Sequence, residues 1–299
     1  MFNIVAKRKY FYLISSLAII ASIFAVIFWK LNFGVDFRGG SVVEISAPGL
    51  ANQQDKILQA GGDSEISIDS LTTSGSDKII IRTGSLSTAK HDKFLANIKK
   101  DAGANAAEDS YQNVGPVVSH DLTVKAIWAV IIASIAIIFY VAYAFRKVPK
   151  PASSWRFGVT AVVALIHDLI ITTGFVAVVG HFYSFMQVDS LFITALLTIM
   201  GFSVHDTIVV FDRLRENLIR HPKNDLASLA NDSILQTISR SINTSITTIL
   251  VLTALFVLGG SSISHFVLTL IAGITFGTYS SIFIATMLLI SWDRNQIKN

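Results

Sequence analysis

Residues 200–217 read MGFSVHDTIVVFDRLREN, and this stretch decides how the rest of the sequence is interpreted. It begins within an apolar run and ends among charges, and His205 and Asp206 lie before the run is over. A charged side chain at the centre of a membrane helix costs roughly 2.5–3.5 kcal/mol on the insertion scale. Acids in such places are rare and commonly face a partner, a cavity or an ion path. Asp206 is therefore the first candidate functional residue.

The composition is typical of a membrane protein. Of the 299 residues only 15% are charged and 52% are hydrophobic, whereas a soluble domain carries about 25% charged residues. The mean hydropathy is +0.58. With no Cys, disulfide frameworks and thiolate chemistry are excluded. The pI near 9.2 would suggest nucleic-acid binding only if the basic residues gathered on one soluble face, which they do not, so no nucleic-acid partner is expected.

Six apolar runs are each long enough to cross a bilayer, which requires about 20 apolar residues. The first run follows Lys7, Arg8 and Lys9. It is longer than the ~7–15 apolar residues of a signal peptide and lacks a small-residue cleavage site, which predicts an uncleaved anchor. The six runs cover residues 11–29, 126–145, 157–180, 188–211, 242–260 and 266–290.

A polar, mixed segment separates the first two runs and predicts a small α+β domain. Alternation with period two predicts its strands, and Gly61 and Gly62 are expected to end its first helix. His91 stands alone in a charged helix and is expected to be solvated. The resulting order βαββαβ is the split βαβ, or ferredoxin-like, pattern. The predicted elements are strands over 41–46, 65–71, 78–82 and 107–114 and helices over 52–60 and 87–100.

The distribution of Lys and Arg predicts the orientation in the membrane. The short loops after the second and fourth runs are basic, whereas those after the third and fifth hold no Lys or Arg. Both termini are therefore expected in the cytoplasm, and the domain after the first run in the periplasm. The predicted division is 1–30 for the cytoplasmic N-terminus and transmembrane helix 1, 31–121 for the periplasmic α+β domain, and 122–299 for transmembrane helices 2–6 with cytoplasmic loops and C-terminal tail.

Few ionisable residues lie inside the apolar runs. His167 and Asp168 lie about 11 residues into the third run, which at 1.5 Å per residue places them roughly 16 Å deep. Asp206 lies in the cytoplasmic third of the fourth run, and Arg240 precedes the fifth at a comparable depth. A buried acid, a facing cation and neighbouring hydroxyl groups are the components of a proton relay, and these four residues are its candidates.

A purely structural role is the alternative for these residues. A buried Asp–Arg pair can hold helices together, and His167 can serve as a hydrogen-bond partner between helices. His205 is expected to point about 100° away from Asp206, so adjacency does not make them a pair. Gly273 and Gly277 have the GxxxG spacing that predicts close helix packing. No HExxH motif, Walker lysine loop or suitable Ser/His/Asp set occurs, so neither an enzyme nor a metal or cofactor site is expected.

Several motifs, in order over nearly the whole chain, resemble the SecD/SecF translocase family. GVDFRGG at 34–40 is similar to the family's G-x-D-F-x-G-G motif, and VGPVVS at 114–119 to its V-G-P-x-V segment. The small external domain, the single six-span unit and the basic N-terminus favour the SecF branch. The remaining matches are His167-Asp168 in the third span, the closely similar stretch 201–217, and residues 239–245, 256–260 and 277–285.

The resemblance implies an RND-type bundle of six helices that pairs with SecD to make twelve spans. It further implies a place in the bacterial cytoplasmic (inner) membrane, beside the SecYEG channel, SecA, YajC and the translocating preprotein. Members of the family are thought to couple inward proton flow to movement of their external domains. By motif, Asp206 matches the acid of the family's proton site and Arg240 its arginine partner. His205 stands where the family usually has Asn.

Two motifs that join the external domain to the first two spans are interpreted as hinges, although ordinary turn formation is compatible with the same residues. Two other functions remain open. The chain could be a passive scaffold for SecD and the SecYEG channel, or a small-molecule exporter of the RND type, against which the small external domain argues. The hinge residues are Gly34, Asp36, Gly39 and Gly40 before the domain and Gly115 and Pro116 after it.

Overall fold

The structure is a computed structural model, and it describes residues 3–101, 106–148, 153–183 and 185–297. The chain divides into two compact units. The helical unit comprises residues 1–32, 128–186 and 191–299, and the sheet unit comprises residues 33–127 and 187–190. The loop just before the fourth span therefore belongs to the sheet unit.

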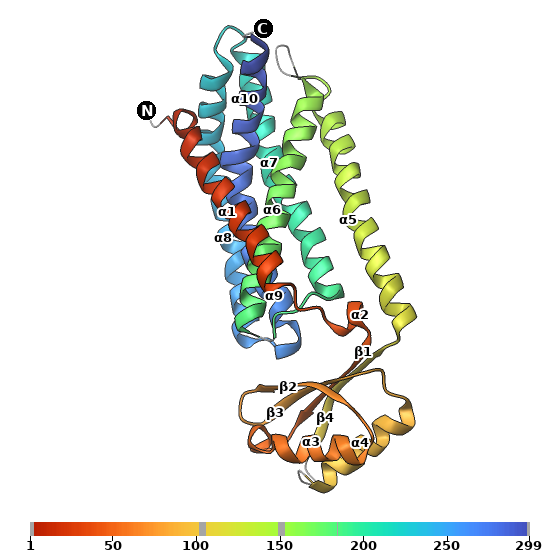
Figure 1. The fold of residues 1–299 in the computed structure, drawn as a ribbon. Helices are drawn as coiled ribbons and strands as arrows, with labels where there is room; N and C mark the ends of the chain where they lie inside the picture. The colour runs from red at the N-terminus through yellow and green to blue at the C-terminus, as the bar shows by residue number, and fades with distance from the viewer. Residues whose placement is uncertain (1–2, 102–105, 149–152, 184, 298–299) are drawn as a thin grey trace. The chain divides into compact units, whose positions relative to one another are not determined.

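Within the described residues, six helical spans are long and apolar enough to cross a membrane, so the chain is the multi-pass helical membrane protein that the apolar runs predict. A short 3-10 turn, η1 (Val5–Lys7), precedes the first span. The last span is built from three consecutive segments, with a π-helical turn in the middle. The spans (Figure 1) are α1 (Arg8–Trp29), α5 (Pro116–Ala144), α6 (Ser154–Phe182), α7 (Ser190–Arg220), α8 (Leu226–Leu258), and α9 (Ser261–Ser280) continued by η3 (Ser281–Ala285) and α10 (Thr286–Ile297).

Helix α8 begins at Leu226, well before the apolar run that starts at residue 242. Its first turns are amphipathic, and Leu229 and Ile234 join the buried core formed with Phe211 and Leu214 of α7. Polar groups support the same contact, because Nδ2 of Asn217 donates to Oγ of Ser233 at 2.8 Å. Tertiary packing thus makes a helix of a segment whose hydropathy alone indicates a loop.

Three aromatic rings fill the core of the helical unit near one end of α7. The ring of Phe157 lies 5.1 Å from that of Phe145 and 4.8 Å from that of Phe211, measured between centroids. The Phe157 and Phe211 rings meet edge to face, an arrangement that adds about 0.5–1.5 kcal/mol to their burial. This cluster fixes α6 and α7 against each other a few turns from Asp168 and Asp206.

Close packing occurs at the two glycines with GxxxG spacing. A Cβ added to Gly273 would lie 2.1 Å from Cδ1 of Ile199, and one added to Gly277 would lie 3.1 Å from Cβ of Ser203. The side chains of α7 therefore occupy the space beside the bare backbone of α9, as the spacing predicts.

Replacing Gly273 by Ala should lower the thermal stability of the protein, because overpacking a filled interface typically costs about 1–3 kcal/mol. Gly201 is the matched control, since it lies in helix α7 with no atom within 4 Å of an added Cβ. Gly201→Ala should be neutral or slightly stabilising. The melting temperatures of the two purified variants measure this difference. Equal values would contradict the close approach of Ile199 to Gly273.

The sheet unit has the predicted βαββαβ order, with two helices on one face of a four-stranded antiparallel sheet (Figure 1). The strand order is β2-β3-β1-β4. Val43 pairs with Ile81, and Ile45 with Ile79, so alternate positions of the two central strands supply the buried core. The elements are α2 (Val35–Arg38), β1 (Gly40–Ser46), η2 (Leu50–Asn52), α3 (Gln54–Asp63), β2 (Ile68–Ser74), β3 (Lys78–Thr83), α4 (Thr88–Asp101) and β4 (Ala107–Val114).

Two local predictions in the sheet unit are wrong. Helix α3 continues through Gly61 and Gly62, and a Cβ on Gly61 would lie 2.7 Å from Cδ1 of Ile68, so this glycine permits close packing rather than ending the helix. His91 is not solvated: it is 8% exposed, stacks on Tyr111 with 3.8 Å between centroids, and places Nε2 3.2 Å from Oε1 of Glu108. Strand β4, distant in sequence, supplies both partners.

Candidate functional site

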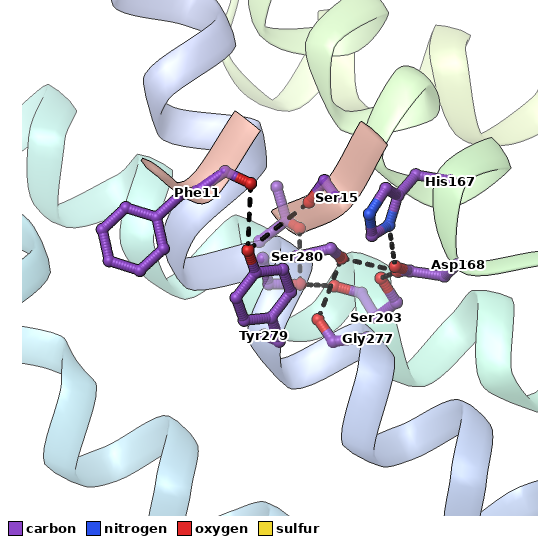
Figure 2. Close-up of polar contacts among 10 residues, drawn as sticks. Phe11, Ser15, His167, Asp168, Ser203, Gly277, Tyr279 and Ser280 are labelled. Carbon is purple, nitrogen blue, oxygen red and sulfur yellow. Dashed lines mark hydrogen bonds and ion pairs between the residues drawn. The ribbon is translucent and has the colours of Figure 1, made fainter. Parts of the chain in front are cut away.

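Asp168 lies at the centre of a buried polar network that joins three helices (Figure 2). The residue is 1% exposed on α6. Its Oδ1 lies 2.9 Å from Nδ1 of His167, and its Oδ2 accepts hydrogen bonds from Oγ of Ser203 on α7, at 2.6 Å, and of Ser280 on α9, at 2.7 Å. A buried carboxyl group needs hydrogen-bond partners to offset its loss of water. Asp168 has three of them and thereby connects α6, α7 and α9.

The π-helical segment η3 begins directly after this network. Oγ of Ser281, its first residue, donates to the backbone oxygen of Ser203 at 2.9 Å and accepts from Oγ1 of Thr207 at 2.9 Å. Two consecutive serines, Ser280 and Ser281, thus reach the neighbouring spans. Single π-helical turns frequently occur at functional sites. Sequence reasoning missed these serines as site residues, although the segment 277–285 was among the family matches.

Tyr279 extends the polar network from α9 to the first span. Its hydroxyl donates to the backbone oxygen of Phe11 at 3.2 Å and lies 3.4 Å from Oγ of Ser15, which donates to it (Figure 2). Its ring lies 6.5 Å from the His167 ring between centroids, at a small interplanar angle. The first span is therefore held against the face of the bundle that carries His167 and Asp168.

Asp206 has a different environment from Asp168. It is also 1% exposed, but its Oδ2 is buried without a hydrogen-bond partner. The hydroxyls of Ser245 on α8 and Thr278 on α9 face its carboxyl group without completing a hydrogen bond to Oδ2. These hydroxyls lie 2.5 Å from each other and already have the backbone oxygens of Ser241 and Ile274 as acceptors. Oδ2 of Asp206 is thus buried without a donor.

Arg240 is not brought to Asp206. Its side chain is exposed on α8, and in the described residues no ion pair joins it to Asp206. His205 is exposed while Asp206 is buried, so the two side chains diverge as their positions on a helix require. The structure therefore separates the four predicted relay residues into the His167–Asp168 centre, the isolated acid Asp206 and the outward-facing Arg240.

The first hinge motif folds around the loop that precedes α7. The backbone N–H of Gly34 donates to the backbone oxygen of Val188 at 2.9 Å, and Phe33 forms a parallel bridge with Val188. Oδ2 of Asp36 accepts a hydrogen bond from the N–H of Ser190, the first residue of α7, at 2.9 Å. A carboxylate at a helix N-terminus stabilises the unpaired N–H groups there. Asp36 thus caps the helix that carries Asp206.

The glycine pair of this motif is fixed by backbone geometry. Gly39 and Gly40 have φ values of +74° and +115°, and a Cβ on Gly40 would lie 2.6 Å from the backbone oxygen of Thr83. The second motif is a helix start, because Pro116 opens α5 and its backbone oxygen accepts from Oγ of Ser119 at 3.0 Å. Gly115 has open space around it. These residues form defined turns in this structure.

Comparison with known proteins identifies the family. Residues 94–295 match the family model described as protein export membrane protein SecD/SecF, C-terminal, and residues 30–47 match the SecD/SecF GG motif. The chain belongs to the SecD/SecF family. The second match includes Gly34 and Asp36, which hydrogen-bond to Val188 and Ser190 at the start of α7. These contacts within the chain therefore involve a segment that is characteristic of the SecD/SecF family.

Among the relatives that align with this SecD/SecF family member over nearly their whole length are SecF subunits. It is 40% identical to "Protein translocase subunit SecF" of Thermobaculum terrenum, over 98% of this chain and 94% of the relative, and 35% identical to the SecF of Anaerolinea thermophila, over 100% and 96%. It also resembles the crystal structure of SecDF from Thermus thermophilus, with a TM-score of 0.83 and 30% identity. That alignment covers 98% of this chain but only 39% of the SecDF chain.

Proposed function

We propose that this SecD/SecF family member promotes the movement of preproteins across the bacterial cytoplasmic membrane as the partner of SecD, using the proton motive force. Its relatives are named protein translocase subunits SecF and SecDF, which supports protein translocation and a SecD partner. The chain corresponds to 38% of the Bacillus subtilis SecDF, so a SecD subunit would supply the remainder. SecYEG, SecA and YajC complete the proposed assembly.

The proposed orientation places both termini in the cytoplasm and the sheet unit in the periplasm, because the short basic loops share one side. Exposed polar residues on α8 support a partner within the membrane. Arg240, Asn243 and Thr247 are exposed on this helix, which is long and apolar enough to span the membrane. Polar side chains that face lipid are unfavourable, so a neighbouring subunit is expected to cover them. Co-purification of the chain with SecD and SecYEG tests this assembly.

The observation that carries the proton-driven part is the burial of Asp206 with its Oδ2 left without a hydrogen-bond partner. An ionised carboxylate enclosed in this way requires a cation or several donors, whereas a neutral carboxyl group can itself donate to a nearby oxygen. Proton binding therefore changes which partners Asp206 needs. In the proposed cycle, loss of the proton attracts Arg240 toward Asp206 and shifts α8 against α7, and a proton that arrives from the periplasm releases the pair.

The free energy supplied by one proton is only part of what the proposed conformational change requires. A charge that crosses the membrane supplies roughly 2.3 kcal/mol per 100 mV. Moving a two-state element from 1:99 to 99:1 requires about 5.5 kcal/mol. A pH gradient or a second proton must supply the difference, and the His167–Asp168 centre is the proposed second station.

Movement of α7 would reach the sheet unit through Asp36, which caps the first residue of this helix. Replacing Asp36 by Ala should abolish the stimulation of export and leave proton flux unchanged. The N–H of Ser190 loses its acceptor, whereas the proposed proton site at Asp206 is not altered. Loss of one cap costs only about 0.5–2 kcal/mol, so the variant should still fold. Asp36→Asn keeps an oxygen acceptor and should retain most of the stimulation.

Proton flux and preprotein export, measured in the same vesicles, check this coupling role. Full stimulation by the Asp36→Ala variant would show that the Asp36–Ser190 contact is not the link. Simultaneous loss of proton flux would show that the contact acts on the membrane site itself rather than on coupling.

A passive scaffold is the second candidate function, and the geometry of Asp168 favours it. A carboxylate that already has three hydrogen-bond partners can be a purely structural junction. Vesicles that contain SecD with and without this chain distinguish the two functions. The proton-driven function requires that the chain raises both proton flux and proton-dependent export, whereas the scaffold raises export alone.

A further inference from the structure

A cavity of about 520 Å³ lies between the start of the first span and the start of α8, both in the helical unit. On one side it is lined by Arg8 and Lys9, the first two residues of α1. On the other side it is lined by Asp225, which immediately precedes α8, and by Asp232 within that helix. Two bases therefore face two acids across one cavity.

The two sides of this cavity are held together by the turn that precedes the first span. Oδ1 of Asn231, on α8, accepts hydrogen bonds from the backbone N–H groups of Ile4, at 2.8 Å, and Val5, at 3.4 Å. The side chain of Val5 is 4% exposed and belongs to the same buried core as Leu229 of α8. The walls of the cavity are therefore fixed before a ligand arrives, which lowers the conformational cost of binding.

The opposite charges on the two sides do not pair with each other. Within the described part of the chain, no ion pair or side-chain hydrogen bond joins either base of the cavity to either acid. Asp225 occupies the N-cap position of α8, yet its side chain makes no cap hydrogen bond. The acids at the end of α7 are paired, by contrast, with Asp212 3.2 Å from Arg215 and Glu216 2.5 Å from Arg220. The cavity thus presents unused charges of both signs.

The cavity lies where lipid headgroups are expected. Arg8 and Lys9 directly precede the apolar run that starts at residue 11, and basic side chains at the end of a span lie at the membrane surface. Leu13 and Ile20 follow Lys9 on the same side of α1, 4 and 11 residues later, and they are 58% and 63% exposed. A ligand whose polar part occupies the cavity therefore has an apolar helix face beside it for a hydrocarbon chain.

We propose that this cavity binds the headgroup of a zwitterionic phospholipid with a primary ammonium group, phosphatidylethanolamine. Its phosphate oxygens accept hydrogen bonds from Arg8 and Lys9, and its ammonium group donates to the carboxylates of Asp225 and Asp232. Hydrogen bonds between ionised partners of this kind are stronger than those between neutral groups. In the proposed orientation of the chain, this lipid belongs to the cytoplasmic leaflet.

The chemistry of the two sides distinguishes this lipid from other phospholipids. Phosphatidylglycerol has a phosphate but no cation, so it leaves both carboxylates unpaired beside an added negative charge. Phosphatidylcholine has a quaternary ammonium group without N–H, so it cannot donate a hydrogen bond to a carboxylate. A purely basic surface would instead prefer anionic lipids, because Lys and Arg attract them through charge alone.

Native mass spectrometry of the purified full chain tests the preference, with the three lipids supplied at equal concentration and with identical acyl chains. Phosphatidylethanolamine should bind about 5-fold more tightly than either of the others, which corresponds to about 1 kcal/mol. Equal binding of the three lipids would show only a non-selective lipid shell and would overturn the inference. Tighter binding of phosphatidylglycerol would also overturn it, because the acids would then have no part in recognition.

Replacing both acids tests their role. Asp225→Asn combined with Asp232→Asn should abolish the preference for phosphatidylethanolamine without a change in melting temperature, since neither side chain has a partner within the described residues. Asp55→Asn combined with Asp63→Asn makes the same change of charge at exposed positions of the sheet unit and should keep the preference. A preference that survives the loss of Asp225 and Asp232 contradicts the proposed site.

A soluble form of the headgroup distinguishes a lipid from a free ligand. Glycerophosphoethanolamine carries the same phosphodiester and ammonium group but no acyl chain, so it cannot use the apolar face at Leu13 and Ile20. It should displace the bound lipid only at concentrations at least about 10-fold above those at which phosphatidylethanolamine itself does so. Displacement at equal concentration would assign the cavity to a soluble phosphoethanolamine ester and overturn the assignment to a lipid. None of these measurements depends on transport activity.

Discussion

Replacing Asp206 by Asn is expected to abolish the proton-dependent part of export stimulation while the protein still assembles with SecD. Asn has the same shape as Asp but cannot bind and release a proton. Its amide can donate to the Ser245 and Thr278 hydroxyl oxygens that face this position, so burial of the side chain is not penalised. Preprotein export with and without a proton gradient, together with co-purification of SecD, measures both parts of this expectation.

His205→Asn is the matched control for Asp206→Asn. It makes the same type of replacement at the adjacent position, where the side chain is exposed and diverges from Asp206. Export should remain at the wild-type level in this variant. If Asp206→Asn also stimulates export like the wild type, the assignment of a proton site to Asp206 is wrong. If instead the protein no longer folds, Asp206 has a structural role.

Replacing Asp168 by Ala is expected to produce the largest loss of stability. The change leaves the donors of His167 and Ser203 without their acceptor in a buried site, whereas the Ser280 hydroxyl keeps the backbone oxygen of Gly277 as an acceptor at 3.1 Å. Each unsatisfied donor costs about 1–3 kcal/mol, so the loss should be about 2 kcal/mol or more. For a chain of this size, that corresponds to a decrease of the melting temperature on the order of 10 °C. Thermal unfolding of the purified protein measures it.

Thr172→Val provides the comparison on the same helix. Oγ1 of Thr172 is buried without a hydrogen-bond partner, so removal of this hydroxyl at nearly constant shape should be neutral or stabilising. If Asp168→Ala has the same melting temperature as the wild type and Thr172→Val, the network does not hold α6, α7 and α9 together.

Much of the architecture could be predicted from local sequence patterns. The lengths of the apolar runs determine six spans, because the thickness of a bilayer sets the length of a spanning helix. Alternation with period two in 41–46 and 78–82 identifies the two central strands, because successive side chains of a strand point to opposite faces. The rarity of acids within spans is sufficient to select Asp168 and Asp206 as candidates.

The hydropathy signal was less informative where packing, rather than lipid, stabilises a segment. The first turns of α8 are polar enough to be interpreted as a loop, but Leu229 and Ile234 are buried against α7. His91 was misjudged for the same reason, because Tyr111 and Glu108, which enclose it, come from strand β4. Neither neighbour can be inferred from the residues around His91 in the sequence.

The sequence by itself determined how many apolar spans there are, roughly where each one lies in the chain, and which family the motifs resemble. Only the tertiary structure decided which polar groups meet. Asp168 and Ser280 are 112 positions apart, and Asp36 and Ser190 are 154 apart. The physical reason is that lipid-facing and helix-facing sides of a span are both apolar, so hydropathy does not determine the rotation of a helix about its axis. That rotation buries Asp206, turns Arg240 outward, and brings two serines of the last span to the carboxylate of Asp168 and to α7.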